Sequence, residues 1–384
     1  MHRRDLLKTA ALAPLLLAGL PRAAAADDGP APLRRLVLVE LNGGNDGLNM
    51  VIPYADPLYA QLRPQLGVAR DQVLPLDERV GFNPALAPLM PMFGGGELAV
   101  LQGVGYTPAN RSHFRSIEIW DTATDSDRIG DEGWLSRVDV ARRFGRPFAA
   151  EAVVIGRNPK PLRGTRMEPV VMADADSFVA EAQGVMPLRE SSANTALRHI
   201  LAVQRDIDAA GRALAAGRPQ PAGDFPRTSF GRDAQQAAAL LIGDPATPVV
   251  KIALTGFDTH VNQRARHDAL LGQLAATFAA LRQAFVAAGI WDQVLIVTYS
   301  EFGRRALQNA SGGTDHGKAA PHFALGGAVK GGLYGEAPQL ARLDDGDVPA
   351  TTDFRRVYNA VLGRWWGVGD ACIEPRRHPA LAIV

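Results

Sequence analysis

The chain has little cysteine, little lysine and almost no net charge, and these shortages exclude some structures and partners. Its 384 residues contain one cysteine, Cys372, so no disulfide can form within the chain. The formal net charge of +1 gives no reason to expect a nucleic acid or an anionic membrane as a partner. After residue 26, no run is apolar enough to cross a bilayer, which takes about 20 apolar residues. What remains is an ordinary globular composition, 47% hydrophobic and 21% charged.

The N-terminal segment has the pattern of an export signal. Met1–Lys8 carries a pair of arginines, Thr9–Leu20 is small and apolar, and Pro21–Ala26 offers cleavage sites of the A-x-A type. The apolar part is too short to span a bilayer of ~30 Å, which argues against a membrane anchor. The arginine pair resembles that of twin-arginine signals. We therefore predict a signal peptide over 1–26, export by the twin-arginine route to the periplasm or the cell exterior, and no membrane span in the mature chain.

Apolar runs and helical periodicities alternate along the rest of the chain. Short β-rich runs bounded by glycine, proline or polar residues predict strands at 36–41, 98–101, 153–155, 170–172, 249–254, 294–298 and, interrupted by glycine, 323–329. Apolar residues at helical spacing predict helices at 187–216, 232–242, 266–288 and, capped by Thr351 or Thr352, 352–366. This alternation predicts an α/β fold, with a mainly parallel central sheet and helices on both faces. No repeat or linker divides 34–384, so we expect a single domain there.

Polar residues cluster where four of the predicted strands end. They are Asp46; Ser112 and His113; Asp258 and His260; and Glu301 with Arg304, followed by Asp315 and His316. Carboxylates and imidazoles gathered at one edge of a parallel sheet suit one or two divalent metals, and a serine among them can act as a nucleophile. Plainer interpretations stay open. Asp46 also fits a turn, Ser112 a helix N-cap, and Glu301 a local ion pair with Arg304. The Asp258–His260 pair also fits a structural role.

The remaining histidines carry less information. His199, His267 and His378 lie on helix-like or terminal stretches and are interpreted as structural, and His322 stays undecided.

Five motifs occur in an order that resembles a known family. They are Leu41–Asn49, Arg111–Phe114, Phe257–His260, Ser300–Arg304 and Asp315–Gly317. Together with the leader, they closely resemble the bacterial domain of unknown function 1501 family, which is grouped with the alkaline phosphatase and sulfatase superfamily. The resemblance covers essentially the whole chain from about residue 34. It implies an alkaline-phosphatase-like fold.

The resemblance also implies roles for the polar residues. The residues in the place of metal ligands are Asp46, Asp258, His260, Glu301 and His316. The metal would be zinc, calcium, magnesium or manganese. Ser112 stands in the place of the nucleophile, and Arg304 would hold a tetrahedral oxyanion by paired hydrogen bonds. Phe302 stands where the superfamily commonly has a histidine. His113, beside Ser112, is therefore either a catalytic residue or the replacement for that ligand, unless one metal is absent.

Two functions follow as expectations. The first is an exported, metal-dependent hydrolase of phosphate or sulfate esters, with a small molecule or a polysaccharide as the substrate. The second is a non-catalytic exported protein that keeps the fold and binds a polysaccharide, a partner or a surface assembly, since a fold does not establish a function. A complete ligand set would favour the enzyme, and Phe302 weakens that interpretation.

Overall fold

The computed structural model describes residues 32–148, 150–173, 219–243 and 246–384, with isolated positions at 194, 197–198, 201 and 211. The signal peptide predicted over 1–26 lies outside the described residues. So does the helix predicted over 187–216, apart from those isolated positions. Residues Leu33–Val384 contact one another as one unit.

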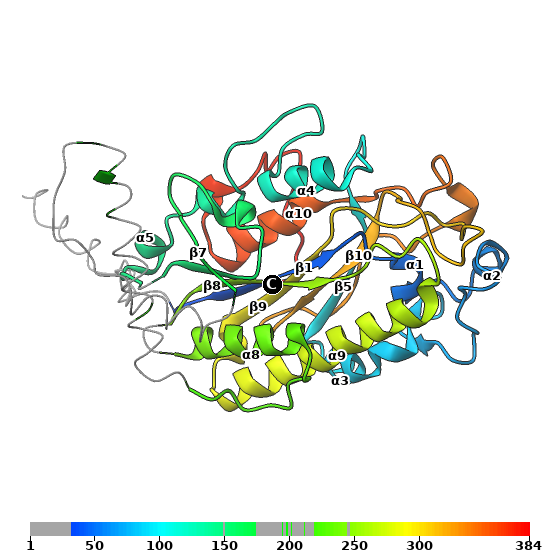
Figure 1. The fold of residues 1–384 in the computed structure, drawn as a ribbon, viewed down its shortest axis with the longest axis horizontal. Coiled ribbons are helices and arrows are strands. Elements are labelled where there is room, and N and C mark those ends of the chain that lie inside the picture. The colour runs from blue at the N-terminus through cyan, green and yellow to red at the C-terminus, as the bar shows by residue number, and fades with distance from the viewer. Residues whose placement is uncertain are drawn as a thin grey trace, which may run out of the picture. The chain divides into compact units, whose positions relative to one another are not determined.

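A nine-stranded sheet runs through this unit (Figure 1). In spatial order eight of its strands are β11 (Gly332–Tyr334), β5 (Leu98–Gly105), β10 (Ala320–Leu325), β9 (Val294–Tyr299), β1 (Arg35–Asn42), β8 (Val249–Thr255), β6 (Ala152–Ile155) and β7 (Val170–Met172). The ninth strand, β12 (Thr352–Asp353), pairs with β5 outside this order. Neighbouring strands are parallel, except that β10 runs antiparallel to β5 and β9. The carboxyl ends of β1, β8 and β9 therefore meet at one edge.

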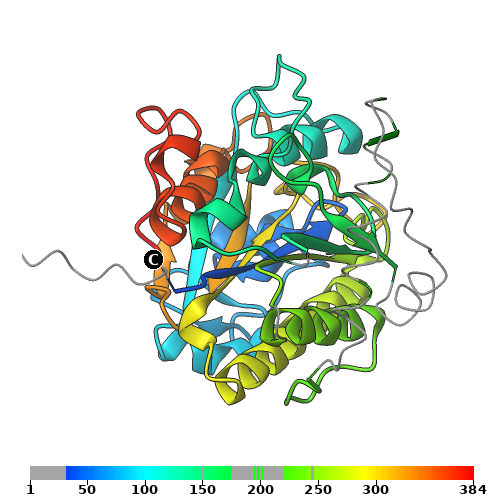
Figure 2. The same ribbon diagram turned by 90° about the vertical axis from the view of Figure 1, so that its left-hand side faces the viewer.

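Helices cover both faces of the sheet (Figures 1 and 2). On one face lie α3 (Met90–Gly94), α8 (Ser229–Ile242) and α9 (Gln263–Ala287), and on the other α4 (His113–Thr122), α5 (Val140–Phe144) and α10 (Phe354–Asn359). Because successive strand residues point to opposite faces, Val39 joins the core with Phe278 of α9, whereas Leu38 joins the core with Trp120 of α4. The predicted α/β architecture, with its mainly parallel sheet, is confirmed.

The remaining elements are short. They are α1 (Gly47–Met50), α2 (Pro57–Leu62), a small sheet of β2 (Val51–Ile52), β4 (Gly81–Phe82) and β3 (Leu74–Pro75), a π-helical turn Ala360–Trp365, and 3-10 helices at Pro84–Leu89, Leu135–Arg137, Lys160–Leu162, Trp291–Gln293, Leu340–Arg342 and Gly369–Ala371.

Two predicted boundaries are wrong. The strand expected over 323–329 is β10, which starts earlier and ends at Leu325. It ends because Gly326 brings the backbone so close to Val294 that an added Cβ would lie 2.3 Å from the carbonyl oxygen of that residue. The last helix is capped by Asp353 rather than by a threonine. The Asp353 carboxylate accepts a hydrogen bond from the backbone N–H of Arg355 at 2.9 Å.

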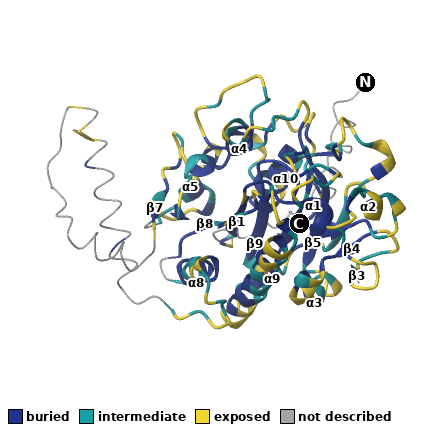
Figure 3. Cartoon of the chain, turned by 45° about the vertical axis from the view of Figure 1, so that its right-hand side comes forward, coloured by how far each residue is buried: buried dark blue, intermediate teal, exposed yellow. Residues whose placement is uncertain are grey.

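Among the described helices, α9 is the one long and apolar enough to cross a membrane by length and composition. Of its most apolar window, 56% is buried inside the protein. Leu271, Leu274 and Phe278 of this helix are fully covered in the core that also contains sheet residues (Figure 3). This burial is typical of the core helix of a globular domain.

Candidate metal site

Loops at the carboxyl edge of the sheet bring one carboxylate and three imidazoles together. Asp258 Oδ1 lies 3.6 Å from Nε2 of His113, 2.9 Å from Nε2 of His260 and 3.3 Å from Nε2 of His316. The two Nε2 atoms of His260 and His316 are 3.0 Å apart. Ligand atoms of His113, Asp258 and His316 all lie within 4.8 Å of one another. We call these four residues the His/Asp cluster.

Three segments distant in sequence supply the cluster. His113 is the first residue of α4, which follows β5 along the chain. Asp258 and His260 lie in the loop between β8 and α9, and His316 lies between β9 and β10. The carboxyl ends of parallel strands are where such α/β sheets present ligand-binding groups.

Each imidazole of the cluster has an oxygen atom behind it. The Nδ1–H of His113 donates to Glu301 Oε1 at 2.9 Å, and the Nδ1–H of His316 donates to the backbone carbonyl of Arg111 at 2.8 Å. Nδ1 of His260 lies 3.5 Å from Asp315 Oδ1. Carboxylate and carbonyl oxygens only accept, so His113 and His316 each carry a proton on Nδ1, while their Nε2 atoms face Asp258. Metal-bound histidines have this arrangement.

The charges of the cluster call for a cation. The hydrogen bond from His113 to Glu301 raises the pKa of His113. Burial lowers the pKa of His316, which disfavours a second proton on that ring. Burial alone would raise the pKa of Asp258, but the hydrogen bond and charge of Arg304 outweigh it and hold this pKa at about 2. A metal cation bound among Asp258 Oδ1 and the Nε2 atoms would use both kinds of group as ligands. The donor set fits a divalent ion.

Glu301 lies behind His113 rather than in the cluster. Its side chain is buried, and Oε1 accepts from the backbone N–H of Gly43 at 2.9 Å as well as from His113. Oε2 accepts from the Ser300 hydroxyl at 3.3 Å. The structure thus places Glu301, predicted as a ligand, where its carboxylate orients the ring of His113 instead of facing Asp258.

Asp46 is also outside the cluster. Its Oδ2 accepts from the Arg63 guanidinium and from the Gln263 amide, and both members of the Asp46–Arg63 ion pair are fully buried. Burial would raise the pKa of Asp46, but the charge of Arg63 outweighs it and the pKa is lowered. Asp46 is therefore an ionised partner of Arg63 beneath the first loop, and the structure does not bring it to the three histidines.

Arg304 joins several loops by hydrogen bonds and does not form an open anion site; we call this role a clamp. Its side chain is fully buried and donates to the carbonyls of Gly44 at 2.7 Å, Thr314 at 2.9 Å and Phe257 at 3.1 Å, and also to that of Gly43. Its Nη2 donates to Asp258 Oδ1 at 2.8 Å. Because these protein oxygens use most of its donors, Arg304 does not present a free pair of hydrogen bonds, and its role toward an oxyanion stays a prediction.

Ser112 directly precedes His113 in the sequence, and Phe302 packs against two rings of the cluster. Ser112 is exposed at the N-cap position of α4, but its hydroxyl makes no capping hydrogen bond. Phe302 is buried, and its ring centroid lies 4.8 Å from that of His113 and 4.4 Å from that of His316. The ring therefore packs under two imidazoles at the place where a further histidine was expected.

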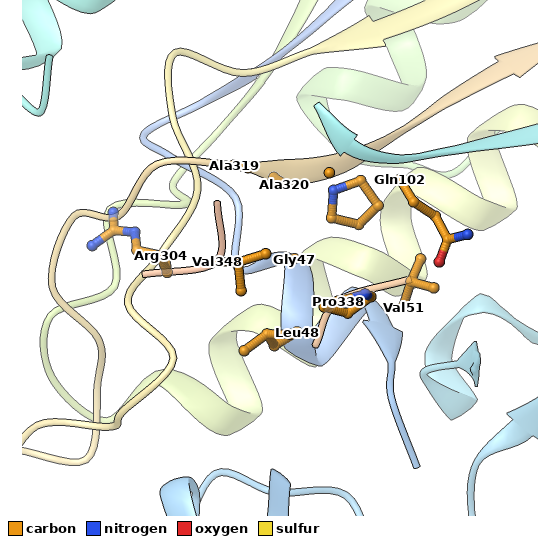
Figure 4. A pocket seen from close by; sticks show the side chains of 11 residues that line it. Gly47, Leu48, Val51, Gln102, Arg304, Ala319, Ala320, Pro338 and Val348 are labelled. Carbon is orange, nitrogen blue, oxygen red and sulfur yellow. The ribbon is translucent and has the colours of Figure 1, made fainter. Parts of the chain in front are cut away.

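A small pocket beside Arg304 is lined mostly by apolar groups (Figure 4). Its lining includes Gly47, Leu48, Val51, Gln102, Ala320 and Pro338. The cavity measures about 20 Å³, which is room for one water molecule. Gln102 Oε1 is buried without a hydrogen-bond partner in the described part of the chain. At this volume the pocket has no room for an ester substrate, and we take the His/Asp cluster as the candidate site because its donor set fits a metal.

Sequence reasoning missed the groups that support the cluster. Arg63 and Gln263 lie in no motif, so nothing in the sequence links them to Asp46. The carbonyl of Arg111 is a backbone atom, which every residue type supplies, and only the fold directs it at His316.

The fold and the cluster define an α/β protein with a candidate metal site of histidine and aspartate residues at the carboxyl edge of its sheet. The chain belongs to the family described as "Protein of unknown function (DUF1501)", which matches residues 158–376, more than half of its length. The family inferred from the motifs is thereby confirmed. Asp258, His260, Glu301 and His316 lie inside the matched region, and His113 precedes it.

Sequence comparison with curated proteins gives no match. Among solved structures, the chain is similar to the PsFucS1 sulfatase from Pseudoalteromonas sp., with 12% identity, a TM-score of 0.40, and coverage of 92% of this chain and 71% of that one. It is also similar to a protein of the alkaline phosphatase superfamily from Vibrio parahaemolyticus, with 10% identity, a TM-score of 0.33, and coverage of 79% and 63%. The lipoteichoic acid synthase LtaP from Listeria monocytogenes has 10% identity and a TM-score of 0.31, with coverage of 79% and 66%. TM-scores below 0.5 carry no conclusion about chemistry.

Proposed function

We propose that this chain is an exported, metal-dependent hydrolase of phosphate or sulfate esters. One observation carries the proposal. The Nε2 atoms of three histidines surround Asp258 Oδ1 at 2.9 to 3.6 Å, and oxygen atoms lie behind all three rings. Oriented ligands with supporting acceptors distinguish a metal site from a chance group of charged side chains.

The residues of the chain take distinct roles in this proposal. His113, His260, His316 and Asp258 would hold the ion. When bound there, a divalent ion supplies Lewis acidity toward a phosphoryl or sulfuryl oxygen. Glu301 fixes the ring of His113, and Arg304 keeps Asp258 ionised.

Ser112 would be the nucleophile. Its exposed hydroxyl directly precedes His113, and the helix does not use it as a cap.

The donor set narrows the choice of metal. Three imidazole nitrogens and one carboxylate suit zinc. Calcium takes six to eight oxygen ligands, magnesium keeps several waters beside one or two carboxylates, and manganese also prefers oxygen ligands. Of the four metals expected from the sequence, zinc therefore fits the cluster best.

Metal content tests the site. The mature protein is purified without chelator and analysed by mass spectrometry for zinc and manganese, beside His316→Ala and Asp370→Asn. Asp370 is exposed and no member of the cluster, so its variant controls for loss of an acid elsewhere. We expect about one equivalent in the wild type and in the control, and less than a tenth of that in His316→Ala. Equal metal content in all three proteins would contradict the site.

A non-catalytic binding protein is the second candidate. The observation in its favour is Arg304, whose donors are committed to the carbonyls of Gly44, Thr314 and Phe257 and to Asp258. These donors are therefore not available as a pair to a transition-state oxyanion. A metal-loaded protein that hydrolyses neither p-nitrophenyl phosphate, p-nitrophenyl sulfate nor bis(p-nitrophenyl) phosphate would favour this candidate.

A further inference from the structure

Three cationic residues follow or precede the site residues in sequence, and each is already paired with an acid. Arg111 stands two residues before His113, Arg305 directly follows Arg304, and Lys318 stands two residues after His316. Such cations would ordinarily bind an anionic substrate beside a metal. In this structure, the carboxylates of one short turn form ion pairs with these cations.

The acidic turn Asp344–Asp347 supplies these carboxylates. Arg111 Nη2 lies 3.1 Å from Asp345 Oδ2 and also contacts Asp347, and Arg305 Nη2 lies 3.4 Å from Asp345 Oδ2. Lys318 Nζ donates to Asp344 Oδ2 at 2.7 Å. The turn thus neutralises three cations with three acids.

The backbone holds the acidic turn in one shape. The N–H of Asp344 donates to the carbonyl of Asp347 at 2.8 Å, and the N–H of Asp347 donates back at 3.1 Å. Between them, Asp345 and Gly346 have φ values of 55° and 78°, as in a two-residue hairpin turn with both central residues left-handed. The side chain of Asp347 is fully buried. The turn therefore places all three carboxylates beside the cations, with Asp347 held by burial and Asp344 and Asp345 largely exposed.

The groups nearest the cluster also leave no surplus positive charge. Arg304 contributes one positive charge, and its Nη2 forms an ion pair with Asp258 Oδ1 at 2.8 Å. Glu301 lies 2.9 Å from His113 and Asp315 lies 3.5 Å from His260, and each adds a negative charge. One guanidinium and three carboxylates carry a charge of −2, which a divalent ion brings to zero. A substrate with two negative charges would meet no further free cation among the residues that the structure describes around the cluster.

We infer that the site selects tetrahedral esters with a single negative charge, and that the acidic turn is the device that sets this selectivity. The inference rests on the proposed metal-dependent hydrolase. Phosphodiesters and sulfate monoesters carry one negative charge, whereas a phosphate monoester carries nearly two at neutral pH. The turn determines specificity by keeping Arg111, Arg305 and Lys318 from an incoming phosphate.

The test measures anion binding to zinc-loaded protein at pH 8 by titration calorimetry, with inorganic phosphate as the dianion and diethyl phosphate as the monoanion. Asp345→Asn, whose side chain is 73% exposed, loosens Arg111 and Arg305 with little risk to the fold. Asp344→Asn does the same for Lys318. The control is Glu168→Gln, which breaks an exposed ion pair with Arg163 that involves no residue of the site.

We expect wild-type protein to bind phosphate no more tightly than diethyl phosphate. Asp345→Asn should tighten phosphate binding at least fivefold and change diethyl phosphate binding less than twofold, and Asp344→Asn should act in the same direction. Wild-type binding of phosphate ten times tighter than of diethyl phosphate, or an unchanged ratio in both variants, would overturn the inference.

Turnover is measured separately and tests the proposed function. A kcat/KM for bis(p-nitrophenyl) phosphate or for p-nitrophenyl sulfate that is ten times that for p-nitrophenyl phosphate would support the inference. Which of the two is hydrolysed would show whether the substrate is a phosphodiester or a sulfate monoester. Absence of all turnover would overturn the hydrolase proposal, while the binding ratio would still decide the charge selectivity.

Discussion

Nδ1 of His113 lies 2.9 Å from Oε1 of Glu301, so a hydrogen bond joins the first residue of α4 to the end of β9 across 188 positions of sequence. The bond fixes which nitrogen of His113 carries the proton and leaves Nε2 free to face Asp258. A carboxylate behind a ligand histidine also increases the basicity of the ring. Glu301 thereby acts on the site through His113.

Glu301→Gln should weaken zinc binding about 10- to 100-fold, the usual effect of losing such a supporting group. The amide oxygen can still accept the Nδ1–H of His113, so the fold should survive, but the negative charge is lost. Competition with a chromophoric chelator measures the affinity, and Glu168→Gln serves as the control. Equal zinc affinity in both variants would show that the charge of Glu301 is unimportant to the site.

Ser112→Ala should abolish ester turnover and leave zinc content and thermal midpoint unchanged. The hydroxyl is exposed and does not cap α4, so its loss removes no stabilising hydrogen bond of that helix. Turnover of the three p-nitrophenyl esters is compared with metal content on the same preparations. Full activity in the variant would exclude Ser112 as the nucleophile.

Arg304→Lys should lower the free energy of unfolding by about 3–5 kcal/mol, because several buried carbonyls are left without donors. The carbonyls of Gly44, Thr314 and Phe257 lie in three different loops, and an ammonium group cannot reach them together. Urea denaturation measures the loss. Arg305→Lys is the matched control, since Arg305 is partly exposed and Lys can keep its ion pairs. Equal losses in the two variants would contradict the clamp.

Asp121 should make the stability fall as the pH rises. Burial, with the nearby charge of Glu40, raises the pKa of Asp121 to about 8 in the folded protein. The unfolded chain has the ordinary value near 3.9, so between about pH 4 and pH 8 the folded state holds the extra proton. This contribution to stability is complete below pH 4 and is lost as the pH rises through the folded pKa.

The isosteric variant Asp121→Asn isolates that contribution. Asn158 Nδ2 donates to Asp121 Oδ2 at 3.0 Å, and an asparagine at 121 can accept the same bond. We expect the thermal midpoint of the wild type to fall more between pH 5 and pH 8 than that of the variant. Parallel pH profiles would refute the assignment to Asp121.

The sequence determined the α/β class and most of the site residues. The runs over 36–41, 249–254 and 294–298 are mostly apolar without alternation, as strands buried on both faces require, and they form β1, β8 and β9. Their two charged residues, Glu40 and Lys251, pair with each other inside the sheet. The carboxyl ends of such strands meet at one edge, so the residues that follow them had to lie near one another. Asp258, His260 and His316 do.

The tertiary structure alone decided which polar groups face the cluster and which face away. Asp46, Glu301 and Arg304 end or follow the same strands, yet they are turned toward Arg63, His113 and backbone carbonyls. A motif gives the position of a side chain along the chain, whereas its partner depends on which loops lie within about 3 Å of it after folding. The groups that select between these orientations lie up to 261 positions away, as for Arg304 and the carbonyl of Gly43, and several of them are backbone atoms common to every residue. No local pattern encodes such a choice.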